Sequence, residues 1–150
     1  MSHIYVTIGP PSPEGALQPR YDHESQILAA ESRVAADWRF GVDIDGRLVF
    51  DLAADRTLMN LDLHIGASRW VTDSEVHWPP AGRPGVLVFD AGSVAEKSFH
   101  LPLDVKVDPG NRVLRIEIGD IAGAQPVRLS DDCAALVTEG ALAGFVLRLE

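Results

Sequence analysis

Cysteine is nearly absent from this chain of 150 residues, because Cys133 is its only one. A single cysteine excludes an internal disulfide and a cysteine-rich zinc site, so we expect a reducing, cytoplasmic compartment. Long apolar runs are also missing, and none approaches the ~18 residues of a membrane-spanning helix. Residues 1–8 have neither the basic start nor the apolar stretch of a secretory signal. The sequence therefore predicts a soluble protein that is not exported and has no membrane partner.

Basic residues are scarce relative to acidic ones. The chain has 13 Lys and Arg against 22 Asp and Glu, which gives a formal charge of −9. A protein that follows a nucleic-acid backbone needs clustered cations, so this balance argues against nucleic acid as a partner. An acidic surplus usually serves solubility, but it also presents a negative surface that attracts a basic protein at low salt.

Helical periodicity is equally scarce. Glycine and proline together number 13 + 10 = 23 and are spread along the chain. Between them lie short stretches in which Val, Ile, Leu and Phe alternate with polar residues, a pattern typical of antiparallel strands. The best helical candidate is 25–37, where Ile27, Ala30 and Val34 have helical spacing. We nevertheless favour a strand or irregular structure there.

The clearest element is a three-stranded meander over residues 39–65. A three-residue loop at 44–46 would pair Val42 with Leu48 and keep the apolar side chains of both strands on one face. Such a loop places Gly46 where a positive φ is required. The sequence therefore predicts a left-handed Gly46.

The meander continues through a second, four-residue loop at 53–56. This loop would pair Phe50 with Met59 and extend the apolar face to Leu63 and Ile65. Polar residues then occupy the opposite face of the third strand: Asn60, Asp62 and His64.

A second hairpin resembles the first at an offset of 55 residues. Positions 103–118 align without a gap to 48–63, with apolar residues at matching alternate positions. In the turn 108–111, Pro109 and Gly110 are the central residues, which suits a type II turn. Internal duplication and convergent hairpin chemistry both explain the match, because alternating strands resemble one another by construction.

These segments predict one all-β domain over residues 1–150. Pseudo-repeat halves at about 21–65 and 86–150, joined by an irregular segment 66–85, would each have an apolar face without a partner. Packing the two faces together gives antiparallel meanders arranged as a sandwich or flattened barrel of about ten short strands. The final strand, 145–149, is the expected edge at which two copies would pair as a homodimer.

Residues 21–28, Tyr-Asp-His-Glu-Ser-Gln-Ile-Leu, resemble the Tyr-Asp-x-Glu-x-Asp-x-Leu opening of a family of small bacterial β proteins of unknown function. The hairpin 103–118 looks like the closing hairpin of that family, and 48–63 looks like it more loosely. Gln26 stands where the family has its second Asp, and Arg115 stands where it has a glycine. The resemblance implies a β fold in a bacterial protein and carries no catalytic residue.

The spacings typical of metal sites are absent from the sequence. The five histidines form no HxH, HxxxH or HExxH pair. Asp62 and His64 share the polar face of one strand, where a solvated face is favoured and zinc would need further ligands. Asp43, Asp45 and Gly46 resemble the start of a calcium loop, but the later oxygen ligands are missing. The sequence therefore predicts no metal and no cofactor.

No nucleophile is indicated either. The chain has no Gly-x-Ser-x-Gly elbow and no glycine-rich phosphate loop. Cys133 follows Asp131 and Asp132, whose charges disfavour a thiolate, and it is typical of a small apolar strand residue. We therefore lean towards a protein without enzymatic activity.

The irregular segment 66–85 contains the candidate binding residues. They are two tryptophans, a histidine and two arginines: Arg69, Trp70, His77, Trp78 and Arg83. Aromatic and arginine side chains in loops often anchor interfaces and ligand sites. The alternative, which we favour, is that both indoles cap the open end of the sandwich as core.

The expected function is contact with another protein. Size, acidity and the missing catalytic motifs and export signal suggest an acidic inhibitor or immunity-type partner of a basic protein. An alternative is a small-ligand or metal-binding β domain, or an enzyme, with its site near Trp70, His77 and Trp78. A structural subunit that forms a homodimer is the third interpretation.

Overall fold

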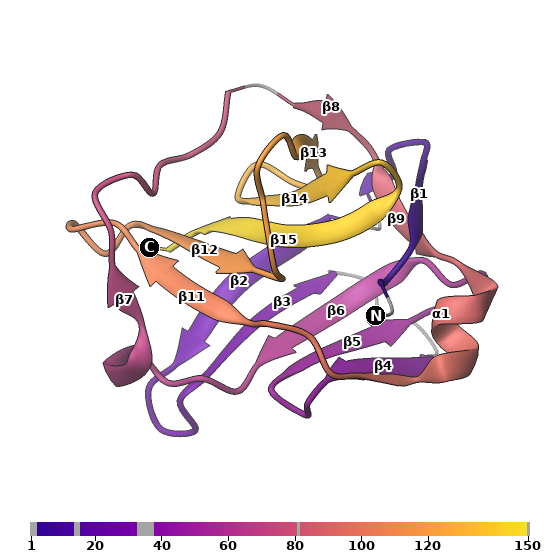
Figure 1. Ribbon diagram of the computed structural model, residues 1–150, viewed down its shortest axis with the longest axis horizontal. Coiled ribbons are helices and arrows are strands. Elements are labelled where there is room, and N and C mark those ends of the chain that lie inside the picture. Colours follow the sequence, from indigo (N-terminus) through magenta and orange to yellow (C-terminus); the bar gives the residue numbers. More distant parts are fainter. Residues whose placement is uncertain (1–2, 14–15, 33–37, 81, 150) are drawn as a thin grey trace.

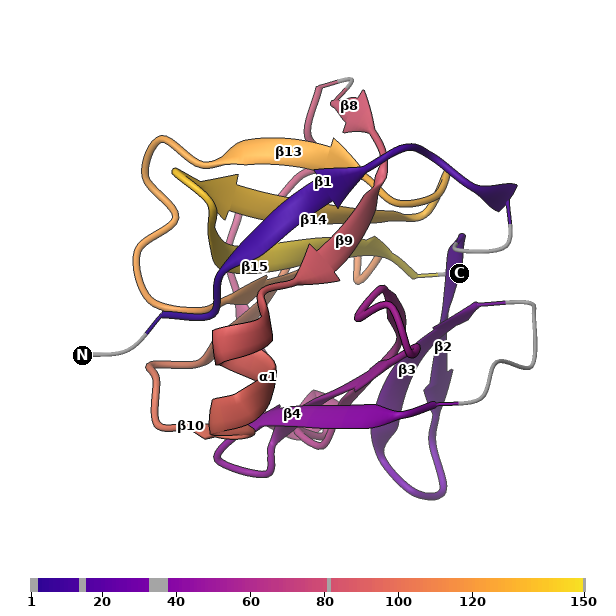
Figure 2. The same ribbon diagram turned by 90° about the vertical axis from the view of Figure 1, so that its right-hand side faces the viewer.

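The computed structural model of the protein describes residues 3–13, 16–32, 38–80 and 82–149. Most strands belong to two sheets that face each other as separate layers (Figure 1 and Figure 2). The prediction of an all-β sandwich is confirmed, and within these ranges the sheets do not close into a barrel. Over the same residues, no helix combines the length and apolar character needed to cross a bilayer.

One layer is a six-stranded sheet built mainly from the first half of the chain. In spatial order its strands are β10 (Ser98–Phe99), β4 (Phe40–Ile44), β5 (Leu48–Leu52), β6 (Leu58–Leu63), β3 (Ile27–Ser32) and β2 (Leu17–Asp22). Its pairs are antiparallel except β10–β4, which is parallel. In the stretch 25–37, the favoured strand is confirmed over β3, and residues 33–37 lie outside the described residues.

The other layer is a seven-stranded sheet from the second half of the chain. In spatial order its strands are β7 (Val71–Thr72), β11 (Asp104–Val107), β12 (Val113–Glu117), β15 (Ala141–Arg148), β14 (Cys133–Thr138), β13 (Gln125–Arg128) and β8 (Arg83–Pro84). The predicted edge at 145–149 is wrong, because β15 pairs with β12 on one side and β14 on the other. A strand with two neighbours has no free backbone groups with which to pair a second copy.

A two-stranded ribbon links the layers along one side of the sandwich. β1 (Val6–Gly9) pairs antiparallel with β9 (Val86–Phe89). Next to it, Tyr5 forms a bridge to Ala141 in the seven-stranded sheet, and the ribbon residue Val88 forms one to Thr57, beside β6. Figure 2 shows the ribbon running between the two layers.

Two short helices complete the described fold. α1 (Ala91–Glu96) connects β9 to β10, and Asp90 caps its first turn by accepting a hydrogen bond from Gly92 N at 3.0 Å. η2 (Ala67–Arg69) is a single 3₁₀ turn between β6 and β7.

The core lies between the layers and is shared by both sheets and the ribbon. Phe50 of β5, Phe89 of β9 and Phe145 of β15 are fully buried. The Phe50 ring centroid lies 5.3 Å from that of Phe89 and 5.8 Å from that of Phe145. The predicted apolar face of the first meander is confirmed by the burial of Val42, Leu48, Phe50, Leu52, Leu61, Leu63 and Ile65.

The first hairpin has the predicted face but not the predicted register. Val42 pairs with Phe50 and Ile44 pairs with Leu48, so the pairing of Val42 with Leu48 is wrong by two residues. The loop is 45–47 instead of 44–46. A shift of two residues keeps every side chain on the same face of the sheet. The alternation of apolar and polar residues therefore fits both registers and cannot distinguish them.

The left-handed Gly46 is confirmed, with φ +68°. It is the second residue of the loop, not the third, and Asp45 before it is also left-handed, at φ +53°. Arg47 N donates to Ile44 O at 2.9 Å across this turn. Two consecutive positive φ angles are typical of the turn that best matches the twist of paired strands.

The second loop of the meander also differs from expectation. Phe50 pairs with Leu61, not with Met59. The register shifts between Asp51 and Leu52, because Met59 is an extra residue in β6. Such a bulge cannot be inferred from alternation alone.

The turn at 108–111 corrects another expectation. Gly110 does not have the positive φ that a type II turn requires, and the left-handed residue is Asn111, at φ +55°. The Asp108 carboxylate accepts hydrogen bonds from Arg112 N at 2.7 Å and Val113 N at 2.8 Å. These bonds hold the backbone in place after the left-handed residue.

The likeness between the two hairpins extends to their register. Phe50 pairs with Leu61 as Val105 pairs with Ile116, at the offset of 55 residues. The strand that flanks each hairpin comes from a different part of the chain. The second strand of the first hairpin, β6, pairs with the earlier strand β3, whereas that of the second hairpin, β12, pairs with the later strand β15. The structural likeness therefore covers one hairpin in each sheet, and the connections beyond it differ.

Candidate functional site

The irregular segment after β6 crosses the outer face of the seven-stranded sheet. Its first strand, β7, pairs with β11 at one edge of the sheet, and β8 pairs with β13 at the opposite edge. Between these strands the chain passes outside the sheet (Figure 1). We call residues 73–80 and 82 the crossing segment.

The two tryptophans of the predicted site lie in different apolar clusters. Trp70 packs against the main core, donates from Nε1 to Ile65 O at 2.8 Å and lies 5.1 Å from the Tyr21 ring. Trp78, in the crossing segment, packs against a smaller cluster on the outer face of the seven-stranded sheet. The Arg148 guanidinium lies 4.2 Å from the centroid of its ring. The structure therefore does not bring the two indoles into one site.

The other predicted site residues are exposed. Arg69, His77 and Arg83 all reach solvent, and none of them forms an ion pair with another described residue. His77 lines a shallow open cleft with Lys106 and Arg115. The five candidates therefore fall into separate places, with Arg69 beside Trp70, His77 beside Trp78, and Arg83 in β8 at the opposite edge of the sheet from β7.

The charges beneath this cleft form a compact network. The Glu117 carboxylate, in a residue that is 7% exposed, accepts hydrogen bonds from Arg115 Nε at 2.8 Å and from Lys106 Nζ at 3.3 Å. Both cations also lie 3.9 Å from Asp73 in the crossing segment. The two cations are thus balanced by two carboxylates, and the network attaches the crossing segment to the sheet.

A different arrangement occupies the outer face of the six-stranded sheet. Figure 2 shows this sheet as the lower layer, with its outer side turned away from the other sheet. Cross-strand neighbours there place Asn60 between Glu31 and Asp51 and put Asp62 one step further along β6. We call Glu31, Asp51, Asn60 and Asp62 the acidic face.

Asn60 is the centre of the acidic face. The residue is 1% exposed, and its Nδ2 donates to Asp51 Oδ2 at 2.8 Å and to Asp62 Oδ2 at 3.2 Å. Its Oδ1 is buried and has no hydrogen-bond donor among the residues that the structure describes. A buried amide oxygen without a donor is unusual in a folded protein and marks an incomplete polar arrangement.

Within the described ranges, the carboxylates of the acidic face have no cationic partner. No described Lys, Arg or His lies within 4.0 Å of Glu31, Asp51 or Asp62. Burial raises the pKa of Asp62, the charges of Asp51 and Glu31 raise it further, and the Asn60 hydrogen bond and His64 oppose this. The charged form of Asp62 is therefore disfavoured, and a nearby cation would favour it.

Neither a metal nor a thiol changes this picture. No group of three His, Cys, Asp or Glu in the described ranges is arranged to hold a metal ion. Asp43 Oδ1, in the predicted calcium-like stretch, accepts from Gly46 N at 3.1 Å and Ser98 Oγ at 2.9 Å. Cys133 is fully buried, and burial raises the pKa of its thiol, in keeping with an apolar strand residue.

Part of the acidic face was visible in the sequence. Asn60 and Asp62 were expected on the polar side of their strand, and they lie there. Glu31 was missed because the sequence did not separate β3 from a helix. Asp51 was missed because the register of β5 against β6 decides which residues lie beside it.

No family model matches the sequence and no curated protein matches it either, so the resemblance of residues 21–28 to a bacterial β family stays a prediction.

Proposed function

We propose that this protein binds a basic protein through the acidic face, as an acidic inhibitor or immunity-type partner. The observation that carries the proposal is the set of three carboxylates around buried Asn60, with no described cation among them. Burial is the main cause of the raised pKa of Asp62, and a cationic side chain from a partner would offset the further contribution from the charges of Asp51 and Glu31. The formal charge of −9 would also speed the approach of a basic protein.

An arginine suits this face better than a lysine. Directly opposed residues on neighbouring strands have Cβ atoms about 4.5–5.5 Å apart, so Asp51 and Glu31 flank Asn60 at short range. A planar guanidinium has five donors and can bridge two carboxylates, whereas an ammonium is a compact point charge. The partner is therefore expected to present arginine at the centre of its contact.

A titration with a short oligoarginine peptide tests the location of binding. Two-dimensional NMR follows the backbone amide signals during the titration. The largest shifts are expected for residues of the acidic face and their cross-strand neighbours Ala29 and Val49. Added salt is expected to reverse the shifts, because exposed charge interactions are screened. Shifts spread evenly over the molecule, or concentrated on another surface, would contradict the proposal.

Variants then test the role of the face with a natural partner. The double variant Asp51→Asn, Asp62→Asn should weaken capture of a basic protein from the source cell by about tenfold or more, since interface charge pairs contribute several kcal/mol. The matched control Asp104→Asn, Asp131→Asn removes the same charge from exposed positions elsewhere and should retain binding. Equal loss in both variants would mean that only net charge matters.

A further inference from the structure

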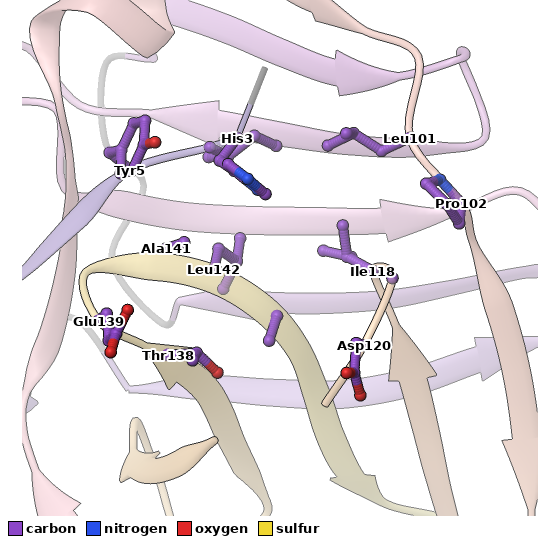
Figure 3. Close-up of a pocket in the computed structure, with 13 residues that line it drawn as sticks. His3, Tyr5, Leu101, Pro102, Ile118, Asp120, Thr138, Glu139, Ala141 and Leu142 are labelled. Atoms are coloured by element: carbon purple, nitrogen blue, oxygen red, sulfur yellow. The ribbon is translucent and has the colours of Figure 1, made fainter. Parts of the chain in front are cut away.

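A cavity of about 440 Å³ opens at one end of the sandwich, away from the acidic face. It lies between the N-terminal segment, the linker before β11 and the turn between β14 and β15 (Figure 3). Its volume falls within the ~300–1,000 Å³ usual for small-molecule sites.

The wall of the cavity is mostly apolar. Ile4, Leu101, Ile118 and Leu142 contribute aliphatic side chains, and all four are buried. Figure 3 shows Leu142 and Ile118 lying between the rim residues. A surface of this kind receives an aliphatic body, whose transfer from water is favourable.

The rim of the cavity is acidic. Asp120 and Glu139 lie on opposite sides of it (Figure 3), and no Lys or Arg is among its lining residues. His3 and Tyr5 supply the remaining polar rings. Thr138 also lines the cavity, and its buried Oγ1 has no hydrogen-bond partner among the described residues.

From this combination we propose that the cavity binds an aliphatic amine. The hydrocarbon part would contact Ile118 and Leu142, and the ammonium group would lie near Asp120 or Glu139. A carboxylate or phosphate headgroup would instead meet two like charges, with no Lys or Arg among the described lining residues to compensate them. The site shares no residue with the acidic face, so the two proposals stand or fall separately.

A headgroup series tests the proposal with hexylamine, hexanol and hexanoate as probes. Methyl signals of Ile4, Ile118 and Leu142 in NMR spectra are expected to shift with hexylamine, less with hexanol and least with hexanoate. Equal affinity for the amine and the carboxylate, or absence of shifts at these methyl groups, would overturn it.

Conservative variants separate charge from shape. Asp120→Asn and Glu139→Gln keep the side-chain volumes, and each is expected to weaken hexylamine by about threefold, as for a solvent-accessible ion pair, while hexanol binding is unchanged. The double variant Asp51→Asn, Asp62→Asn should leave hexylamine binding intact. Loss of hexylamine binding in that variant, with retention in the rim variants, would assign the amine to the acidic face and refute the cavity.

Discussion

At the scale of single residues, backbone conformation matters as much as side-chain contact. Gly46 has φ +68°, and a Cβ built on it would touch nothing within 4 Å. Any loss on substitution there would therefore come from the backbone and not from a clash. The left-handed conformation could be predicted from Asp-Gly between alternating strands, because few residues other than glycine adopt it without strain.

Gly46→Val is expected to destabilise the protein by about 1–2 kcal/mol, because a β-branched residue is strained at positive φ. Urea unfolding followed by circular dichroism measures this change. Gly46→Asn is the control. Asparagine tolerates the left-handed region, so this variant should lose much less stability. Equal losses in both variants would show that the turn does not depend on its φ angle.

Asp62 gives a prediction about pH. Its pKa in the folded protein is raised above the ordinary 3.8, so the folded state holds the proton more tightly than the unfolded chain does. The contribution of Asp62 to stability is thus greatest below pH 3.8 and declines as the pH rises through the folded pKa. Asp62→Asn, which stays neutral, is expected to raise Tm near neutral pH and to lose that advantage in acid.

Thermal unfolding across a pH series checks this expectation. Asp104→Asn, at an exposed position of β11, is the matched control and should show no such pH-dependent gain. A constant gain for Asp62→Asn at every pH would mean that its charge is not responsible.

At the scale of elements, alternation predicted strands and faces but not pairing. The face containing Leu48 and Leu61 was right, yet the strand pairings on both sides of the first meander were wrong by two residues, because such shifts preserve burial. The bulge at Met59 and the left-handed Asn111 depend on local hydrogen bonds that leave no periodic signal.

The crossing segment shows a further limit of sequence reasoning. The segment 66–85 was recognised as irregular and rich in aromatic residues, but its path over the outer face depends on two-residue strands, β7 and β8. Strands this short have no alternation to detect. The separation of Trp70 from Trp78 follows from that path and could not be predicted.

Trp78→Ala is expected to destabilise the protein by about 2 kcal/mol, because the partly buried indole packs against the apolar cluster on the outer face and its loss would expose that cluster to water. Arg148→Ala should lose only about 0.5–1 kcal/mol, the typical contribution of an exposed cation–π contact. Denaturant unfolding of both variants measures the difference. A smaller effect for Trp78→Ala than for Arg148→Ala would show that the crossing segment does not protect the sheet.

At the scale of the whole molecule, the two layers and the ribbon depend on one core. Phe50, Phe89 and Phe145 come from the six-stranded sheet, the ribbon and the seven-stranded sheet, and their rings pack together. The sequence indicated two apolar faces that would pack together, but it did not indicate that β9 would add a third component. The sandwich was therefore predictable, whereas its closure by the ribbon was not.

A shared core predicts cooperative unfolding. Intrinsic fluorescence reports on the main core through Trp70 and on the outer face through Trp78, and far-UV circular dichroism reports on both sheets, so the two signals of the unmodified protein should change at the same denaturant concentration. Phe89→Ala should lower stability by about 3–5 kcal/mol and shift both midpoints together. Separate midpoints would show that the layers unfold independently.

The path of the crossing segment also bears on self-association. β7 and β8 occupy opposite edges of the seven-stranded sheet, and each offers only two residues to an incoming strand. On the other layer, the edge strand β2 contains Pro19, which has no N–H to donate. Fibril growth by edge-to-edge strand addition is thereby discouraged at these three edges.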